Sequence, residues 1–266
     1  MDLRSIRQSV VAAGVLLAVA TSAHASSVTL SLPSNFGTAI TPGLTSGVSV
    51  NFESTGFVGN VGVGAINWTV TASDDSSFKV GDAVQTFCIQ GLQDVHPGGS
   101  YAYNVGNLSD APLPVGGTDQ GFLDTLAGEQ IQGLVNGYSQ YVGQTFMSHN
   151  ANDVAAGIQL AIWEVIYDGG QGGETFGAIT NYFGSNTLNN FQANGTNADG
   201  TAAIDVANYM LNHFSPSQKV DAVAFESRSD QDQFIPHAVP LPAALPAGLM
   251  LLGLLACARK VSQKLA

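Results

Sequence analysis

The chain has 266 residues, of which 45% are hydrophobic and 11% are charged, and its formal net charge is −12. This length predicts one large domain or two small ones, with enough apolar residues for a core. The acidic balance excludes the classes of protein that hold nucleic acid or an anionic membrane surface through a basic face.

The first 25 residues have the pattern of a secretory signal peptide. Two arginines precede an apolar run at residues 10–20, and residues 23–25 (Ala-His-Ala) form a small-x-small cleavage motif. We predict cleavage between Ala25 and Ser26, so that the mature chain begins at the serine. The alternative is an N-terminal membrane anchor, which the short length of the run disfavours.

Residues 26–90 read as β-structure. Apolar and polar residues alternate at 28–32, 48–52 and 65–71, and a further strand is expected at 86–89. This last strand contains Cys88, which would be the only cysteine of the exported body if the tail carrying Cys257 is removed. Exported proteins usually pair their cysteines, so Cys88 is either a buried inert thiol or a functional one.

Helices are expected in the second half of the body. One or two helices fit residues 119–141, Asp153 is the predicted cap of a helix over residues 154–167, and a third fits 201–214. A strand at 221–225 follows. The order of elements predicts an α+β fold, a β-barrel or β-sandwich with an inserted helical segment.

Gln159 stands out in the middle helix because its neighbours are apolar on nearly every side. A helix of this composition is buried, and a buried amide must find hydrogen-bond partners. Gln159 is therefore either a core amide bonded to backbone groups or part of a functional site. Trp163 follows four positions later, on the same helical face.

The C-terminal segment predicts a second address signal. An apolar stretch at 244–258 ends in a basic cluster, which should remain on the cytoplasmic side. The stretch is preceded by a proline-rich motif made of Val239, Pro240, Leu241, Pro242 and Ala243. The alternative is an ordinary permanent anchor.

This tail resembles the PEP-CTERM sorting tail in its Val-Pro-Leu-Pro-Ala variant. The resemblance implies recognition by an exosortase in the inner membrane of a Gram-negative bacterium, transient insertion there, and cleavage near the motif. Release or attachment at the cell surface would follow. The resulting division is a signal peptide at 1–25, a body at 26–226, a linker at 227–238 and the tail at 239–266.

Within the body, residues 86–89 (Thr-Phe-Cys-Ile) and 159–163 (Gln-Leu-Ala-Ile-Trp) resemble the thioester domains of bacterial surface adhesins. The resemblance implies that the Cys88 sulfur and the Gln159 side-chain carbonyl join as an internal thioester, with loss of ammonia. We expect a water-excluding pocket around this bond. Its predicted lining is Phe87, Ile162, Trp163 and Tyr167.

A thioester predicts covalent adhesion rather than turnover catalysis. A lysine amine or a hydroxyl on the target would take the acyl group of Gln159 and release the thiol, once per molecule. The protein would then not be an enzyme, and no cofactor is expected. The identity of the target surface or matrix component stays open.

Two other readings remain. In the first, Cys88 and Gln159 are core residues of a non-covalent structural protein of the extracellular matrix or exopolysaccharide. In the second, Cys88 is the nucleophile of a cysteine hydrolase or transferase with His96 or His149 as its base, although no hydrolase signature surrounds it. The five histidines are scattered without ligand spacing, so no metal site is predicted.

Overall fold

The computed structural model describes residues 26–52, 56–91, 93–115, 118–122, 125–169, 191–217 and 220–236. The predicted signal peptide and sorting tail lie outside these residues. Within the described part of the chain, no helix is both long enough and apolar enough to cross a membrane.

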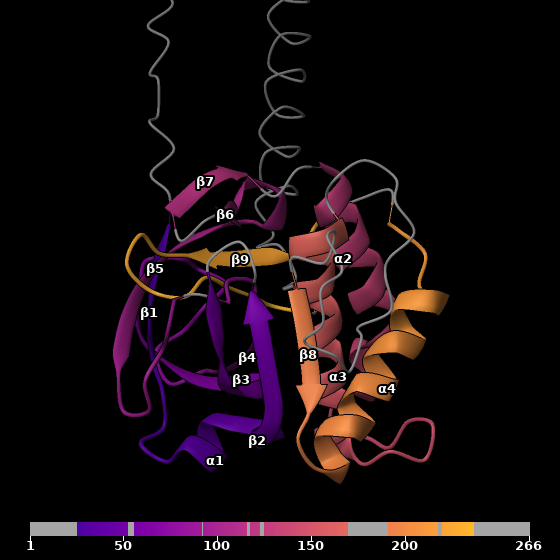
Figure 1. The fold of residues 1–266 in the computed structure, drawn as a ribbon. Helices are drawn as coiled ribbons and strands as arrows, with labels where there is room; N and C mark the ends of the chain where they lie inside the picture. The colour runs from indigo at the N-terminus through magenta and orange to yellow at the C-terminus, as the bar shows by residue number, and fades with distance from the viewer. Residues whose placement is uncertain are drawn as a thin grey trace, which may run out of the picture.

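Six antiparallel strands close into a barrel (Figure 1). Around the ring they are β1 (Ser27–Ser31), β5 (Ser100–Asn107), β9 (Val223–Glu226), β10 (Gln233–Phe234), β4 (Ala83–Cys88) and β3 (Phe57–Ser73). The ring closes because β1 pairs with β5 on one side and with β3 on the other. Together with the helices, this barrel confirms the predicted α+β class.

The sheet extends beyond the barrel because β3 is long enough to serve two sets of partners. Its first half pairs with β2 (Ile40–Phe52), and its second half pairs with β4 and β1. Strand β8 (Phe191–Gly195) adds to the outer side of β2. A short helix α1 (Phe36–Ala39) precedes β2, and β6 (Pro112–Val115) and β7 (Thr118–Phe122) form a separate hairpin.

Aromatic side chains fill the barrel. Trp68 of β3 and Tyr103 of β5 meet edge to face, with ring centroids 6.1 Å apart, although their strands are separated by β1. Phe225 of β9 lies 6.1 Å from Tyr103. Because β3 and β5 are not neighbours, the contact between Trp68 and Tyr103 places these side chains inside the barrel, and all three rings are buried.

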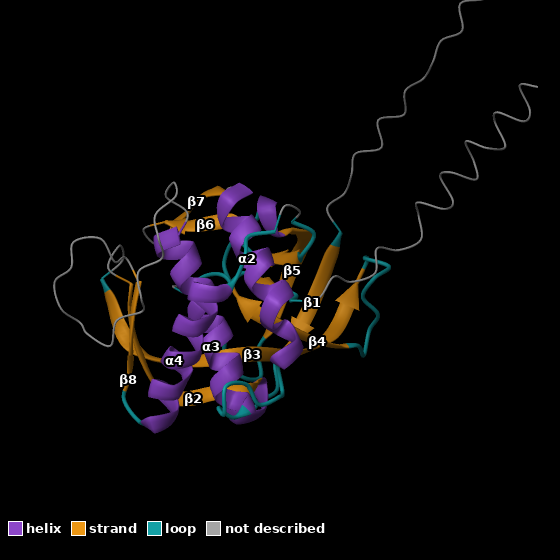
Figure 2. Cartoon of the chain, turned by 90° about the vertical axis from the view of Figure 1, so that its right-hand side faces the viewer, coloured by secondary structure: helices purple, strands orange, loops and turns teal. Residues whose placement is uncertain are grey.

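The helices α2 (Thr125–Tyr138), α3 (Ala151–Glu164) and α4 (Ala198–His213) gather on one side of the sheet (Figures 1 and 2). Every residue of α3 from Asp153 to Glu164 is buried, as its apolar composition predicts. Gly157 permits this packing, because a Cβ there would lie 2.6 Å from a methyl carbon of Val206 on α4. A π-helical turn at Val165–Gly169 ends the helix.

The structure moves three predicted helix starts, and α4 begins at Ala198 rather than at residue 201. The cap of α3 is Asn150, whose side chain accepts hydrogen bonds from the backbone N–H groups of Asn152 and Asp153. Asp153 instead occupies the third helical position and completes the capping box. An acidic side chain is suited to this position as well as to the cap position. The region expected to be helical from residue 119 begins with β7, and α2 starts at Thr125.

The segment predicted as a linker from Ser227 onward is part of the barrel. Strand β10 lies within it and fills the place between β9 and β4. Its polar sequence is compatible with burial because the polar groups are bonded: the Gln233 side chain accepts from Thr86 at 3.0 Å, and the Asp232 side chain accepts from the Ser227 N–H at 2.6 Å. The body therefore extends past residue 226, through Pro236.

Candidate functional site

Cys88 is the last residue of β4 and is 2% exposed. Its thiol donates to the backbone carbonyl of Gln90 at 2.5 Å. Burial raises the pKa of this thiol well above its ordinary value, and the carboxylates of Asp232 and Asp94 act in the same direction. The thiol is therefore neutral at rest and shielded from bulk water.

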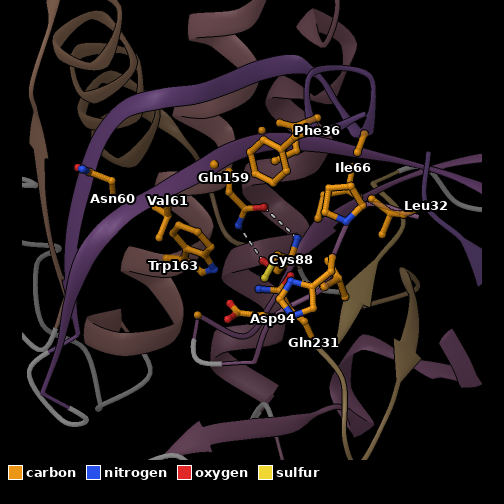
Figure 3. A pocket seen from close by; sticks show the side chains of 18 of the residues that line it. Leu32, Phe36, Asn60, Val61, Ile66, Cys88, Asp94, Gln159, Trp163 and Gln231 are labelled. Atoms are coloured by element: carbon orange, nitrogen blue, oxygen red, sulfur yellow. Dashed lines mark hydrogen bonds between the residues drawn. The ribbon is translucent and has the colours of Figure 1, made fainter. Parts of the chain in front are cut away.

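Gln159 of α3 is 1% exposed and forms two hydrogen bonds with the backbone of Cys88. Its side-chain oxygen accepts from the Cys88 N–H at 2.9 Å, and its side-chain nitrogen donates to the Cys88 carbonyl at 2.8 Å (Figure 3). The two residues are 71 positions apart in the chain. The helix and the end of β4 thus hold the carboxamide directly against the cysteine residue.

This pairing fixes the orientation of the carboxamide. The carbonyl oxygen faces a backbone N–H, which would stabilise negative charge developing on that oxygen. Because both partners are rigid backbone groups at the end of a barrel strand, the side chain of Gln159 has little freedom to turn. The arrangement suits attack on the side-chain carbonyl carbon by a nucleophile lying beside it.

A cavity of about 380 Å³ opens over this pair. Cys88, Gln159 and Trp163 form part of its wall. Asp94 and His96 belong to the loop between β4 and β5 and are exposed. Apolar side chains complete the wall, among them Leu32, Phe36, Ile40 and Ile66. No lysine or arginine is among the lining residues that the structure describes.

Trp163 is 3% exposed and packs edge to face against Phe52, at 5.6 Å between ring centroids. Its indole nitrogen points toward Cys88 (Figure 3). Among the described residues, no acceptor lies at hydrogen-bond distance and angle from this N–H. The N–H is nevertheless near enough to the sulfur to oppose the rise in the pKa of Cys88 that burial causes.

The other three residues of the predicted pocket are buried but are not among those that line the cavity. Phe87 faces the opposite side of β4 from Cys88 and packs near Phe234, at 6.2 Å between ring centroids. Ile162 is fully buried in the core. Tyr167 accepts a hydrogen bond from the Gly91 N–H at 3.0 Å, so it supports the turn that follows Cys88.

Three polar residues that the sequence did not single out hold the turn after Cys88. The side chain of Gln231 donates to the Gln90 carbonyl at 2.7 Å, and the Gln90 side chain accepts from the Asp232 N–H at 3.0 Å. The Ile89 N–H donates to the Asp232 carbonyl at 3.0 Å. The sequence pattern did not predict these contacts, because residues 231 and 232 lie in the segment that was predicted to be a linker.

Neither histidine considered as the base of a hydrolase is hydrogen-bonded to the Cys88 thiol in the described hydrogen bonds. His96 lies at the same cavity as Cys88, but the hydrogen bond described for the thiol goes to the Gln90 carbonyl and not to an imidazole. His149 is elsewhere, in an isolated bridge with Phe146 before α3. In the described ranges, no group of three or more His, Cys, Asp or Glu side chains is placed to hold a metal ion.

No protein-family profile matches the sequence, and no curated protein matches it. Two solved structures are similar at 11% identity. One is the N-terminal thioester domain of fibronectin-binding protein SfbI from Streptococcus pyogenes, with a TM-score of 0.36 over 76% of this chain and 98% of that chain. The other is the pilus-presented adhesin Spy0125 (Cpa), with a TM-score of 0.35 over 78% of this chain and 67% of that chain. Scores this low carry no argument about function, which must come from the site itself.

Proposed function

We propose that this chain is an exported surface adhesin whose body forms an internal thioester between Cys88 and Gln159 and uses it to attach covalently to a target. The observation that carries the proposal is the reciprocal pair of hydrogen bonds, 2.9 and 2.8 Å, between the Gln159 carboxamide and the Cys88 backbone. These bonds bring a nucleophile and an acyl group from distant parts of the chain to one buried place.

Formation of the bond would proceed by attack of the Cys88 sulfur on the side-chain carbonyl carbon of Gln159. The C–N bond breaks, and the thiol proton leaves with the departing amide nitrogen as ammonia. The Cys88 N–H stabilises the negative charge on the oxygen of the tetrahedral intermediate. Rotation of the thiol away from the Gln90 carbonyl is the movement that this step requires.

The cavity supports a primary amine as the attacking group of the target. A lysine side chain is narrow enough to enter a space of about 380 Å³, and its charge is attracted by the Asp94 carboxylate at the cavity. The wall residues described include no positive charge that would repel it. Attack would form an amide through Gln159 and release the Cys88 thiol.

The two ends of the chain complete this proposal. Residues 1–25 would direct export, and the motif at 239–243 would direct processing by an exosortase at the inner membrane. The mature protein would then act at the cell surface or outside the cell. The acidic body and the absence of a predicted cofactor are compatible with adhesion by a single covalent step.

Methylamine tests the proposal because it is a small amine that can enter the cavity. After treatment, we expect one methylamide on Gln159 and one newly released thiol at Cys88, which is then alkylated with iodoacetamide, and both are located by peptide mass spectrometry. The variants Cys88→Ser and Gln159→Glu keep the shape of the site and should show neither change. If the untreated unfolded protein already has a free Cys88 thiol and takes up no methylamine, the non-covalent matrix protein is the better account.

A further inference from the structure

The indole N–H of Trp163 is a buried hydrogen-bond donor that the folded chain leaves without an acceptor. Trp163 is 3% exposed, and its nitrogen is among the few buried polar side-chain atoms of the described residues that have no partner. Such a group is costly, and in a native structure it calls for an explanation. Here the donor faces a cavity wall that also contains Cys88 and Gln159.

The sulfur of Cys88 is the candidate acceptor, since burial raises the pKa of this thiol and the Trp163 side chain acts on it to lower that pKa. The indole nitrogen points toward this residue (Figure 3), and the Cys88 carbonyl is already engaged by the Gln159 side chain at 2.8 Å. A neutral thiol is a weak acceptor, whereas a thiolate is a strong one. The Trp163 N–H therefore makes at most a weak interaction with the neutral thiol and would make a strong hydrogen bond to the thiolate.

We propose that Trp163 is a catalytic residue whose indole N–H donates a hydrogen bond to the Cys88 sulfur while that sulfur is negatively charged. This inference rests on the proposed thioester. When a target amine attacks the Gln159 acyl carbon, the C–S bond breaks and its electron pair goes to the sulfur. The indole N–H stabilises this thiolate, which then takes the proton that the attacking amine loses.

The same interaction assists formation of the bond. The sulfur becomes more nucleophilic as its proton departs, and burial alone would oppose that step by disfavouring the charged form. A donor that binds the charged sulfur more tightly than the neutral one lowers the barrier without stabilising the resting state. This selectivity gives a reason why the buried N–H of Trp163 has no partner in the resting protein.

The test is to remove the N–H while keeping the shape of the indole. Site-specific incorporation of benzothienylalanine at position 163 replaces the N–H with sulfur in a ring of nearly the same size. We expect methylamine to open the thioester about 10- to 100-fold more slowly, the range for one hydrogen bond to a charged group. The pKa of the released Cys88 thiol, followed by thiolate absorbance, should rise.

The chain offers a matched control and a second variant. Benzothienylalanine at Trp68, the other tryptophan, should leave the opening rate unchanged. Trp163→Phe should slow opening in the same direction, provided that its unfolding transition shows a folded protein. A folded position-163 variant that forms no thioester would be the extreme of the same effect.

Two negative results can be told apart. If intact mass shows no thioester in the wild-type protein, the proposed function fails and this inference fails with it. If the wild type carries the thioester but the benzothienylalanine variant at position 163 opens at the wild-type rate with the same thiol pKa, only the role of Trp163 is overturned.

Discussion

Strand β4 places Thr86 and Cys88 on the same face, and each lies beside a buried tryptophan and a buried glutamine. At Thr86 the polar groups are fully engaged: Trp68 donates to the Thr86 hydroxyl at 2.8 Å, and this hydroxyl donates to the Gln233 side chain at 3.0 Å. At Cys88 the glutamine is bonded but the indole N–H of Trp163 is not.

The two regions differ in whether the buried indole N–H has a partner: that of Trp68 does, and that of Trp163 does not. Both indoles are almost completely buried, 2% exposed for Trp68 and 3% for Trp163, so burial alone does not explain the missing bond. The Trp68 region shows that this fold can satisfy a buried indole with a neighbouring side chain. At Cys88 the neighbouring group is a thiol, which becomes a good acceptor only on losing its proton.

Removal of the segment shared by both regions should have the largest effect. Residues 231 and 232 hold the turn after Cys88, and Gln233 completes the Thr86 group. A chain that ends after Glu226 loses a barrel strand and should not fold, as judged by the loss of a cooperative urea transition. A chain that ends after Pro236 is the control and should unfold like the longer protein. A folded shorter chain would restore the linker interpretation.

Replacement of Gln159 by methionine should break the Cys88 region specifically. It leaves the backbone N–H and carbonyl of Cys88 unbonded in a buried place, at about 1–3 kcal/mol for each group. We expect its free energy of unfolding to lie roughly 2–6 kcal/mol below that of Cys88→Ser, measured by urea denaturation, together with complete loss of covalent capture. Cys88→Ser is the comparison, since it should lose capture while keeping both hydrogen bonds. Equal stability of the two variants would mean that the bonds contribute little.

Thr86→Val should break the other region without affecting the chemistry. The substitution leaves the Trp68 N–H and the Gln233 oxygen without their partner, and we expect a loss of about 2–4 kcal/mol in unfolding free energy. Thr86→Ser retains the hydroxyl and should lose much less. The thioester should form in both variants, and its absence from folded Thr86→Val protein would show that the two regions are not independent.

Asp94→Asn should have a smaller effect that sharpens the account of the target. Removal of one exposed carboxylate lowers the local concentration of a cationic amine, so methylamine should react about two- to fivefold more slowly relative to hydroxylamine, which is uncharged at neutral pH. High salt screens the carboxylate, so under that condition the wild-type protein and Asp94→Asn should give the same ratio of the two rates, measured by mass spectrometry. An unchanged ratio at low salt would remove Asp94 from the recognition of amines.

The pH dependence of stability should show the smallest effect. Burial raises the pKa of the Cys88 thiol, so its ionisation costs more in the folded protein than in the unfolded one. After opening by methylamine, the neutral buried thiol does not reduce the stability of the protein at a pH below the ordinary thiol pKa. As the pH rises above that value, the thiol ionises more readily in the unfolded chain, so the free energy of unfolding falls. The Cys88→Ser variant has no thiol to ionise, so its unfolding free energy should fall less between neutral pH and about pH 10. Parallel curves would contradict a raised pKa.

Much of the barrel could be predicted from the sequence because its strands alternate clearly. Residues 48–52 and 65–71 lie in β2 and β3, although both strands are longer than the alternation indicates. The barrel strand β5 was not predicted, and strands β8 and β10 were missed because their glutamines and asparagine resemble loop composition. Gln192 and Gln233 are nevertheless buried, which only long-range pairing with other strands makes possible.

The candidate site could be predicted in its central pair and in Trp163, but not in the rest of its surroundings. Cys88 and Gln159 carry the recognisable motifs, whereas α3 is buried on all sides, so its periodicity could not show which residues face the cavity. Phe87 could have been excluded, because a period of two places it opposite Cys88. Asp94 and His96 come from a loop whose path depends on the barrel; His96 was considered only as the base of a hydrolase, and no local pattern places Asp94 at the cavity.

The intact mass of the purified, untreated protein tests the central claim most directly. A bond between the Cys88 sulfur and the Gln159 acyl carbon requires the loss of one ammonia, so the wild-type protein should be lighter than its mature sequence by that mass. Cys88→Ser, processed in the same way, should have its full sequence mass. A wild-type protein at full sequence mass, with Cys88 free to react once unfolded, would contradict the account.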